Sequence, residues 1–516
     1  MRKTTVEPSF THSPSGIGLA TSRHSSVRRV RTTHLCTGPG VATSDCGCQH
    51  LGCVVVASED PAELAKGENR QLDREIWRLA LPAFLALVAE PLFLLADAAI
   101  VGHLGTTALA GLGVAGAVLQ TLVGLCVFLA YGTTAGVARL LGAGDLRAAL
   151  AQGIDGIWLA VLIGVPVTLV GIAATGRLVD LLGAQPDVAA PATTYLRIAF
   201  VGVTPLLVMM AATGILRGLQ DTRTPLVVAV AGNALNIVLN LVLVYGVGGL
   251  GGMGIAGSAL GSVLAQAASA AALMWVVVRG ARREGASLRP DRLGITRAAQ
   301  ASIALVIRTL TLRAALLLTT YAVVLGASRS GGDQSVSVAT HQIAFTIWSF
   351  LAFALDAVAI AAQAITGRYL GAGDRAGTRA VTNRMVRWGA LGGVGSALLL
   401  AATSPLLGPL FSGDDRVHEL LVPVLLVAAA GQPVAGVVFV LDGVLIGAGD
   451  GTYLAWAGLA VLVVYAPVLL LVATAGGGVV LVWVVFSAVL MGARLVVLLA
   501  RARGEAWLVT GTRAAA

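Results

Sequence analysis

The chain has 516 residues, of which 57% are hydrophobic and only 12% are charged, and its formal net charge is +9. A soluble domain carries about 25% charged residues because its surface must face water, so this composition excludes a soluble enzyme. The positive charge does not indicate nucleic-acid binding, because the Arg residues lie between apolar blocks and no basic patch with interleaved aromatic residues is present.

Residues 1–70 are predicted to form a disordered N-terminal extension, because they are polar and rich in Ser, Thr and Arg. Four of the five cysteines lie in this extension, namely Cys36, Cys46, Cys48 and Cys53. Their spacing matches no usual zinc motif, so we expect neither a metal site nor another cofactor. An alternative is that the native chain begins near residues 54–56, which would leave residues 1–55 outside the native protein.

From residue 76 onward the chain is a series of apolar segments, and each is long enough for the roughly 20 helical residues that cross a bilayer. The first six are 76–102, 108–138, 151–174, 190–215, 225–246 and 254–278. The second six are 300–326, 336–366, 384–403, 418–446, 453–473 and 477–500. The short alternating segments of a membrane β-barrel are absent from this pattern. The predicted fold is therefore all-α, a polytopic membrane protein with twelve transmembrane helices.

Arg residues are concentrated in every second connection between these spans, above all in the basic stretch 279–297. Cytoplasmic loops carry an excess of Lys and Arg. We therefore expect a multi-pass protein of the cell (plasma) membrane with both termini in the cytoplasm. Arg308, Arg313 and Asp442 lie toward the cytoplasmic ends of their spans and are expected to reach the membrane surface.

Two motifs recur at one offset. Leu-Gly-Ala-Gly-Asp at 141–145 returns at 370–374, and Leu-x-Gly-x-x-Asp at 216–221 returns at 445–450, each 229 residues later. The chain is therefore predicted to be a tandem duplication of a six-helix unit, with the halves related by an axis along the membrane normal. The Gly-Asp turns are expected to act mainly as helix C-caps and turns.

This repeat divides the chain into five parts. We expect the extension at 1–70, a first six-helix bundle at 71–279, a cytoplasmic basic linker at 280–298, a second six-helix bundle at 299–501 and a C-terminal tail at 502–516. Two equivalent halves that enclose a central cleft are typical of a transporter that works by alternating access.

Ionisable groups within a membrane span cost about 2.5–3.5 kcal/mol each on insertion scales, so each calls for an explanation. Glu90 and Asp97 share one face of the first span, and Pro91 should kink that helix. In the fifth span Asn233, Asn236 and Asn240 form one stripe. Asp97, Asn240 and Ser262 are expected at one depth, where they could bind a proton, bind a small cation, or clamp three helices together.

The sequence resembles the MATE (multidrug and toxic compound extrusion) transporters, and within them the DinF-like branch. The resemblance covers about 73–500 and rests on Ala-Glu-Pro-Leu at 89–92 with Asp97, on the Gly-Asp motifs, and on Asn-Ile-Val-Leu-Asn at 236–240. It implies two six-helix bundles that export organic compounds in exchange for a cation. Further matching stretches are 81–83, 101–105, 138–145, 216–225, 340–343 and 355–363.

Carried over by position, the resemblance makes Asp97 the essential carboxylate of the first helix and makes Asn236 and Ser262 its partners on the fifth and sixth helices. Four residues after the Asn that matches Asn236, the family often has Asp, whereas this chain has Asn240. Because sodium sites gain affinity from carboxylates, proton coupling is favoured over sodium. To the helix kink and substrate cleft we assign Glu90, Pro91, Asn233, Gln120, Asp356 and Gln363.

The expected partners are a small organic substrate, with organic cations as one class, together with H+ and the lipid bilayer, and we expect the protein to act as a monomer. One alternative is a lipid-linked precursor flippase of the same broad superfamily, which should line the cleft with Arg or Lys. A remote alternative is an integral-membrane enzyme, but no acid–base or metal cluster indicates one. The substrate and the physiological role do not follow from the sequence.

Overall fold

The computed structural model describes residues 61–247, 251–331 and 333–512, and residues 60–516 form one compact unit. Helices are the regular elements throughout these described ranges, without any strand. Most of the predicted N-terminal extension, including its four cysteines, lies outside the described residues. From Pro61 onward the chain is helical.

The described residues of the first half form eight helical segments. They are α1 (Pro61–Gly102), α2 (Thr106–Cys126), α3 (Phe128–Gly142), α4 (Leu146–Leu181), α5 (Pro186–Val201), α6 (Val203–Gly218), α7 (Arg223–Tyr245) and α8 (Ile255–Arg283).

The second half repeats this pattern. Its helices are α9 (Arg292–Ser330), α10 (Gln334–Gly371), α11 (Arg375–Phe411), α12 (Asp415–Gly447), α13 (Gly451–Thr474), α14 (Val479–Val485) and α15 (Met491–Arg503). A five-residue π-helical segment, Phe486–Leu490, joins the last two. Helices α10 and α12 are continuous where the first half has the pairs α2 and α3 and α5 and α6.

Among the described residues, eleven helices are long and apolar enough to cross a membrane, or twelve if the bent pair α5 and α6 counts as one span. This agrees with the twelve predicted spans. The bend of 47° falls at Gly202, just before Pro205, which has no N–H to offer the carbonyl of Val201. Beside the bend, the Thr168 hydroxyl of α4 donates to the Phe200 carbonyl, at 3.1 Å.

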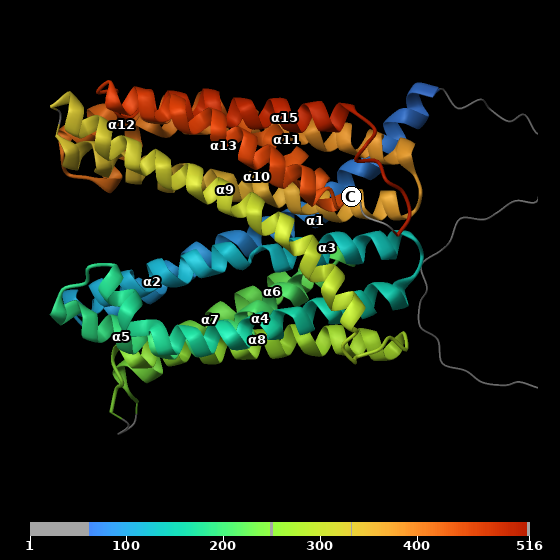
Figure 1. Cartoon of the computed structure of the whole chain (residues 1–516), viewed down its shortest axis with the longest axis horizontal. Helices are drawn as coiled ribbons and strands as arrows, with labels where there is room; N and C mark the ends of the chain where they lie inside the picture. The colour runs from blue at the N-terminus through green and yellow to red at the C-terminus, as the bar shows by residue number, and fades with distance from the viewer. Residues whose placement is uncertain (1–60, 248–250, 332, 513–516) are drawn as a thin grey trace, which may run out of the picture. The chain divides into compact units, whose positions relative to one another are not determined.

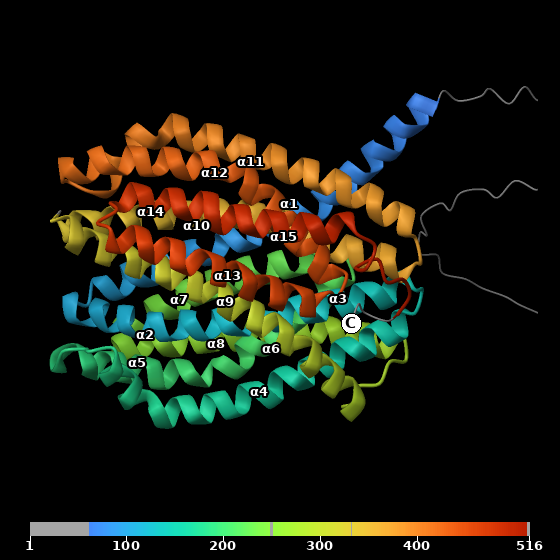
Figure 2. The same ribbon diagram turned by 45° about the horizontal axis from the view of Figure 1, so that its top comes forward.

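Helices α2–α8 form one bundle together with α1, which packs on α7, and α9–α15 form a second, as Figures 1 and 2 show from two directions. Within the first bundle α7 packs on α8 and α3 on α6, and within the second α11 packs on α12 and α9 on α13. The two bundles meet mainly where α10 contacts α1 and α3.

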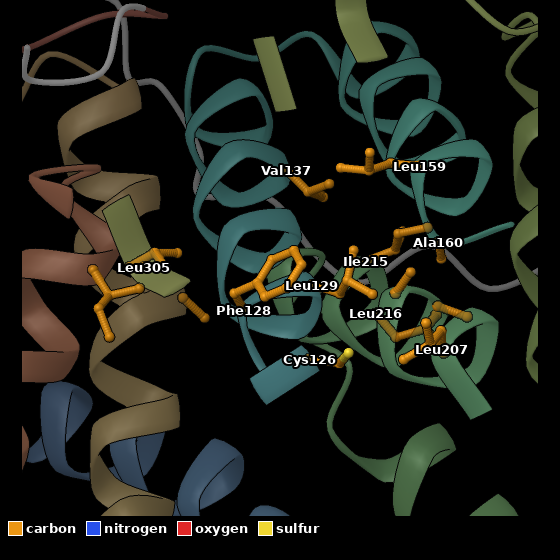
Figure 3. Packing of buried hydrophobic residues seen from close by; sticks show 14 of the residues in the cluster. Cys126, Phe128, Leu129, Val137, Leu159, Ala160, Leu207, Ile215, Leu216 and Leu305 are labelled. Atoms are coloured by element: carbon orange, nitrogen blue, oxygen red, sulfur yellow. The ribbon is translucent and has the colours of Figure 1, made fainter. Parts of the chain in front are cut away.

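The largest apolar core joins the two halves. Figure 3 shows Cys126, Leu129 and Ile215 packed among α3, α4 and α6, with Leu305 of α9 beside Phe128. The same cluster continues through Ile365 of α10 and Val444 of α12. A second cluster contains side chains of the second half alone. Cys126 is a small buried side chain of this core.

The repeated motifs meet at one end of the unit, which we call the Arg139 end. Arg139 donates to the Ala448 carbonyl at 2.6 Å, and its repeat mate Arg368 donates to the Gln220 side chain at 2.7 Å. Each Arg thus reaches the turn that follows the fourth span of the opposite half. Arg368 also pairs with Glu75, and Arg384 pairs with Asp73 at 2.6 Å.

In the Gly-Asp turns Gly144 and Gly373 have a φ of 81°, the left-handed conformation typical of helix C-caps, and each Asp also caps the start of the following helix, which was not predicted. The Asp145 carboxylate accepts from the Ala148 N–H at 2.8 Å, and Asp374 accepts from the Gly377 N–H at 2.7 Å. Capping is only part of their role, because a Cβ at Gly371 would clash with the backbone of Arg139 in the other half. The turns therefore also form the contact between the halves.

The segment between the halves is shorter than the predicted linker, because α8 continues to Arg283 and α9 begins at Arg292. The intervening loop is fastened to α4. Trp158 donates to the Leu288 carbonyl at 3.1 Å, and the Asp155 carboxylate accepts from the Asp291 N–H at 3.0 Å.

The described part of the C-terminal tail folds back across the Arg139 end. Trp507 is only 1% exposed and donates to the Ala502 carbonyl at 3.1 Å. Arg139 donates to the carbonyls of Val509 and Gly511, at 2.8 and 3.2 Å, while the Gly511 N–H donates to the Leu370 carbonyl at 2.9 Å. The tail thereby holds residues of both halves.

Candidate functional site

A buried carboxylate lies at the centre of the first bundle. Asp97 of α1 is 3% exposed, and three side chains on three other helices point donors at it. Its Oδ1 accepts from Ser258 at 2.6 Å and from the Asn240 amide at 2.7 Å, and its Oδ2 accepts from the Tyr195 hydroxyl at 3.4 Å. We call these four residues the Asp97 cluster.

A second hydrogen bond lies beside this cluster. The Asn236 amide donates to the Ser262 hydroxyl at 3.0 Å, and Asn236 and Asn240 are both buried on the same face of α7. Their side-chain carbonyl oxygens have no hydrogen-bond partner within the described residues. Together with the Asp97 carboxylate they form a group of buried oxygen acceptors that can take up a proton donor or a cation.

The sequence analysis expected Asp97, Asn240 and Ser262 at one depth. In the structure Asn240 is hydrogen-bonded to Asp97, whereas Ser262 is hydrogen-bonded to Asn236 and not to Asp97. The structure adds two partners that the sequence analysis missed. Ser258 could have been found, since it lies one helical turn before Ser262 on the same helix. Tyr195 carried no signal, because its position on α5 is an ordinary one for a packed aromatic residue.

The other polar residues predicted on α1, α2 and α7 lie outside this cluster. Asn233 donates to the Ala89 carbonyl at 3.1 Å, next to Glu90. The side chains of Glu90 and Gln120 are exposed, and no ion pair to Glu90 occurs within the described ranges. Pro91 lies inside α1, which continues through it as one helix.

Asp356 of α10 lies where the halves meet. Its carboxylate interacts with the Tyr131 hydroxyl of α3 and faces the guanidinium groups of Arg217 on α6 and Arg308 on α9. The charges around Asp356 therefore come from both halves. Gln363, on the same helix, is 2% exposed and packs against Gly447 of α12, so it is not part of this group.

The expectation that Arg308 and Asp442 reach the membrane surface is wrong. Arg308 forms an ion pair with Asp442, and Arg494 pairs with the same carboxylate oxygen at 3.3 Å. The ion pair replaces the solvation that the surface would have supplied. Arg313 extends toward α2, where a Cβ at Gly124 would come within 2.9 Å of its guanidinium carbon.

The MatE family model matches residues 82–242 and 313–491, which make up well over half of the chain and fall one in each bundle. The chain belongs to the MATE family. MATE proteins are transporters, so this chain is a multi-pass membrane transporter and not an enzyme.

Curated relatives include Protein DETOXIFICATION 44, chloroplastic, of Arabidopsis thaliana. It is 31% identical over 402 residues, which cover 75% of this chain and 74% of the relative. DNA damage-inducible protein F of Escherichia coli is 29% identical over 388 residues, which cover 74% of this chain and 82% of that protein. Both agree with the resemblance to the DinF-like branch.

Solved MATE structures share the fold. A Vibrio cholerae MATE transporter in a bent form superposes with a TM-score of 0.76 at 21% identity, covering 86% of this chain and 99% of that one. A MOP superfamily transporter from Pyrococcus furiosus superposes with a TM-score of 0.75 at 21% identity, covering 84% and 96%. The fold of this MATE chain, two six-span bundles, is thus that of known transporters.

Proposed function

We propose that this MATE transporter exports small organic compounds in exchange for protons, and that Asp97 carries the proton. The observation that carries the proposal is the Asp97 cluster itself, a carboxylate buried in a membrane span among three donors from three other helices. Such a group is costly to keep in a membrane, and helix packing alone does not require it.

Proton coupling is favoured over sodium by the ligands that Asp97 has. Asn240 supplies an amide where a second carboxylate would help to hold a metal cation, and it uses that amide N–H to bond Asp97. Ser258 and Tyr195 also donate to the carboxylate. A carboxylate surrounded by N–H and O–H donors releases and rebinds one proton more readily than it collects the six or more oxygen ligands typical of hard cations.

The proposed cycle uses the contact between the halves. We place the Arg139 end and both termini on the cytoplasmic side. At this end the repeated turns and the C-terminal tail hold the two halves together. This arrangement corresponds to the state open to the outside. Protonation of Asp97 loosens its bonds to α5, α7 and α8 and lets α1 bend near Pro91, which expels the substrate. Release of the proton to the cytoplasm resets the cycle.

The substrate path is proposed to run between the bundles, along Glu90, Gln120 and Asp356. The flippase alternative receives less support from the same region. Arg217 and Arg308, the arginines that a lipid pyrophosphate would need, already face Asp356, and Arg308 also pairs with Asp442.

The test uses the full chain in liposomes loaded with ethidium, a fluorescent organic cation, under an imposed proton gradient or an imposed sodium gradient. We expect proton-driven efflux from the wild type. Asp97→Asn, which keeps the shape but cannot carry the proton, should reduce efflux to the level of protein-free liposomes. Asp180→Asn, an exposed carboxylate on α4, serves as the control and should retain efflux.

Unaltered proton-driven efflux in Asp97→Asn would exclude the proposed role of this residue. Efflux that follows only the sodium gradient would exclude proton coupling. Thermal unfolding of both variants in detergent checks that they are folded. If the wild type moves ethidium under neither gradient, the same liposomes with a labelled lipid-linked precursor test the flippase alternative.

A further inference from the structure

Two arginines share a single carboxylate inside the second bundle. Arg308 of α9 and Arg494 of α15 both bond Oδ2 of Asp442 on α12, and the three side chains are 15%, 12% and 8% exposed, respectively. All three residues lie within helices that qualify as membrane spans. We call them the Asp442 cluster.

The charges of this cluster do not balance. Two guanidinium groups face one carboxylate, and a further carboxylate, that of Asp356, interacts with both Arg308 and Arg217 of the first half. The five groups together carry three positive and two negative charges. An uncompensated charge costs several kcal/mol in a membrane interior, so the cluster favours an anion beside it.

The hydrogen-bond donors are in excess as well. Each guanidinium has five N–H donors, yet the bonds recorded for Arg308 and Arg494 within the described residues all go to the one Asp442 oxygen. Buried donors without acceptors are costly. An acceptor-rich ligand would satisfy them.

A cavity adjoins these donors. It measures about 40 Å³ and is lined by the three charged residues and Thr311, with apolar walls that include Ala315 and Leu490. A cavity needs only about 10–15 Å³ of such space to hold a water molecule, so there is room for a small ion beside the two guanidinium groups.

We propose that the Asp442 cluster binds one small inorganic anion of the size and charge of chloride. The anion contacts Arg308 and Arg494 and brings their charges into balance. Since Arg308 also faces Asp356 at the meeting of the halves, the anion helps to hold the helices that carry this contact. This site lies in the second half of the chain, has an excess of positive charge and binds an anion, whereas the proposed proton site lies in the first half and is built on a carboxylate. The anion proposal does not depend on the proton proposal.

The test measures thermal unfolding of the purified full chain in detergent while chloride replaces gluconate at constant ionic strength. Gluconate is a much larger anion than chloride. We expect chloride to raise the wild-type midpoint by about 2–5 °C, with saturation, because a ligand that binds only the folded state stabilises it. Equal midpoints in chloride and gluconate would overturn the proposal and leave water as the occupant.

Three variants locate the effect. Arg494→Gln makes the cluster neutral and should abolish the chloride response. Asp442→Asn removes the carboxylate that competes with chloride for the guanidinium groups. The chloride concentration that gives half of the maximal midpoint shift should therefore be lower than in the wild type. Arg501→Gln is the matched control, because Arg501 also lies on α15 but pairs one-to-one with Asp450, at 2.6 Å. It should keep the wild-type response.

A chloride response that persists in Arg494→Gln, or one that is lost in Arg501→Gln, would overturn this assignment. If Arg494→Gln does not fold, the Asp442→Asn titration decides. An unchanged half-saturating concentration in that variant would contradict the proposed site.

Discussion

Asn240 is the residue at which the Asp97 cluster discriminates between a proton and a metal cation. Its amide N–H bonds Asp97 at 2.7 Å, and its own carbonyl oxygen has no partner within the described part of the chain. A carboxylate at this position would replace that donor with an acceptor. Two carboxylates at this distance cannot both stay ionised unless a cation lies between them.

Asn240→Asp is therefore expected to make the protein responsive to sodium. Two carboxylates with the Asn236 carbonyl and the Ser258 hydroxyl would offer the oxygen ligands that hard cations prefer. Replacing N-methylglucamine with sodium should raise the unfolding temperature of this variant by about 2–5 °C, and leave that of the wild type unchanged.

Asn233→Asp is the control on the same stripe of α7. Asn233 bonds the Ala89 carbonyl and lies outside the Asp97 cluster, so an added carboxylate there should not create a sodium response. If both variants respond equally, the effect arises from added charge alone and the role given to Asn240 is wrong.

Much of the Asp97 cluster could be predicted from the sequence because membrane spans make polar residues conspicuous. Asp97 and Asn240 stand out against apolar neighbours, and helical spacing places them on definite faces. The sequence could not predict which donor meets which oxygen, since this depends on how the helices are rotated against one another. The same limit explains the error at Arg308, whose partner Asp442 lies on a helix that is distant in sequence.

At the scale of helices, the contact between the halves depends on the two glycines that end the second span of each half. A Cβ at Gly142 would lie 2.9 Å from the Cα of Arg368, and a Cβ at Gly371 would lie 3.1 Å from the Cα of Arg139. Both approaches involve backbone atoms, which cannot turn aside as a flexible side chain does. The repeat thus explains why small residues occupy both positions.

Gly371→Ala is expected to destabilise the closed contact at the Arg139 end. The added methyl group meets the backbone of the opposite half, and overpacking of this kind costs about 1–3 kcal/mol. This loss of stability should appear as a lower midpoint of thermal unfolding in detergent. Gly142→Ala should lower the midpoint in the same way, because Gly142 and Gly371 occupy corresponding positions of the repeat.

Gly392→Ala supplies the comparison. Gly392 lies inside α11, and a Cβ added there would have nothing within 4 Å. Replacing a helical Gly by Ala in open space stabilises by about 0.5–1 kcal/mol. A midpoint in Gly371→Ala that equals or exceeds that of Gly392→Ala would show that the halves do not need this close approach.

The helices themselves were largely predictable, because a bilayer imposes a minimum apolar length on each span. The bend at Gly202 and the short loop between α8 and α9 were not. Beside the bend, the Phe200 carbonyl accepts from a hydroxyl of α4, a contact that depends on how the two helices pack. Asp155 and Trp158 hydrogen-bond the backbone of the loop and fasten it to α4. The loop is therefore short, and α8 and α9 both extend through charged residues beyond their apolar segments.

In the molecule as a whole, the two halves are related by sequence and yet use their matching arginines differently. Arg368 binds side chains of the first half, Glu75 and Gln220. Arg139 binds backbone carbonyls of the second half and of the tail. The tail follows the last helix and has no counterpart after the first half, so it makes the Arg139 end asymmetric and adds a contact that the repeat does not provide.

A chain that ends at Arg503 is therefore expected to open more readily at the Arg139 end. The truncation removes two carbonyls that accept from Arg139, and hydrogen bonds to charged groups contribute about 1.5–3 kcal/mol each. Since about 1.4 kcal/mol corresponds to a tenfold change in an equilibrium constant, the closed arrangement should lose at least that factor. Trp507→Ala should act in the same direction by removing a buried anchor.

The measurement is the distance between spin labels attached through Arg147→Cys and Arg375→Cys, in a chain whose native cysteines are replaced by serine. These positions lie in the first turns of α4 and α11, close after the two Gly-Asp turns. Truncation should increase the population at longer distances. Glu505→Ala, which removes only a side-chain contact to Arg379 at the exposed start of the tail, should leave the distribution unchanged. A truncated chain with the wild-type distribution would mean that the repeated turns close this end without the tail.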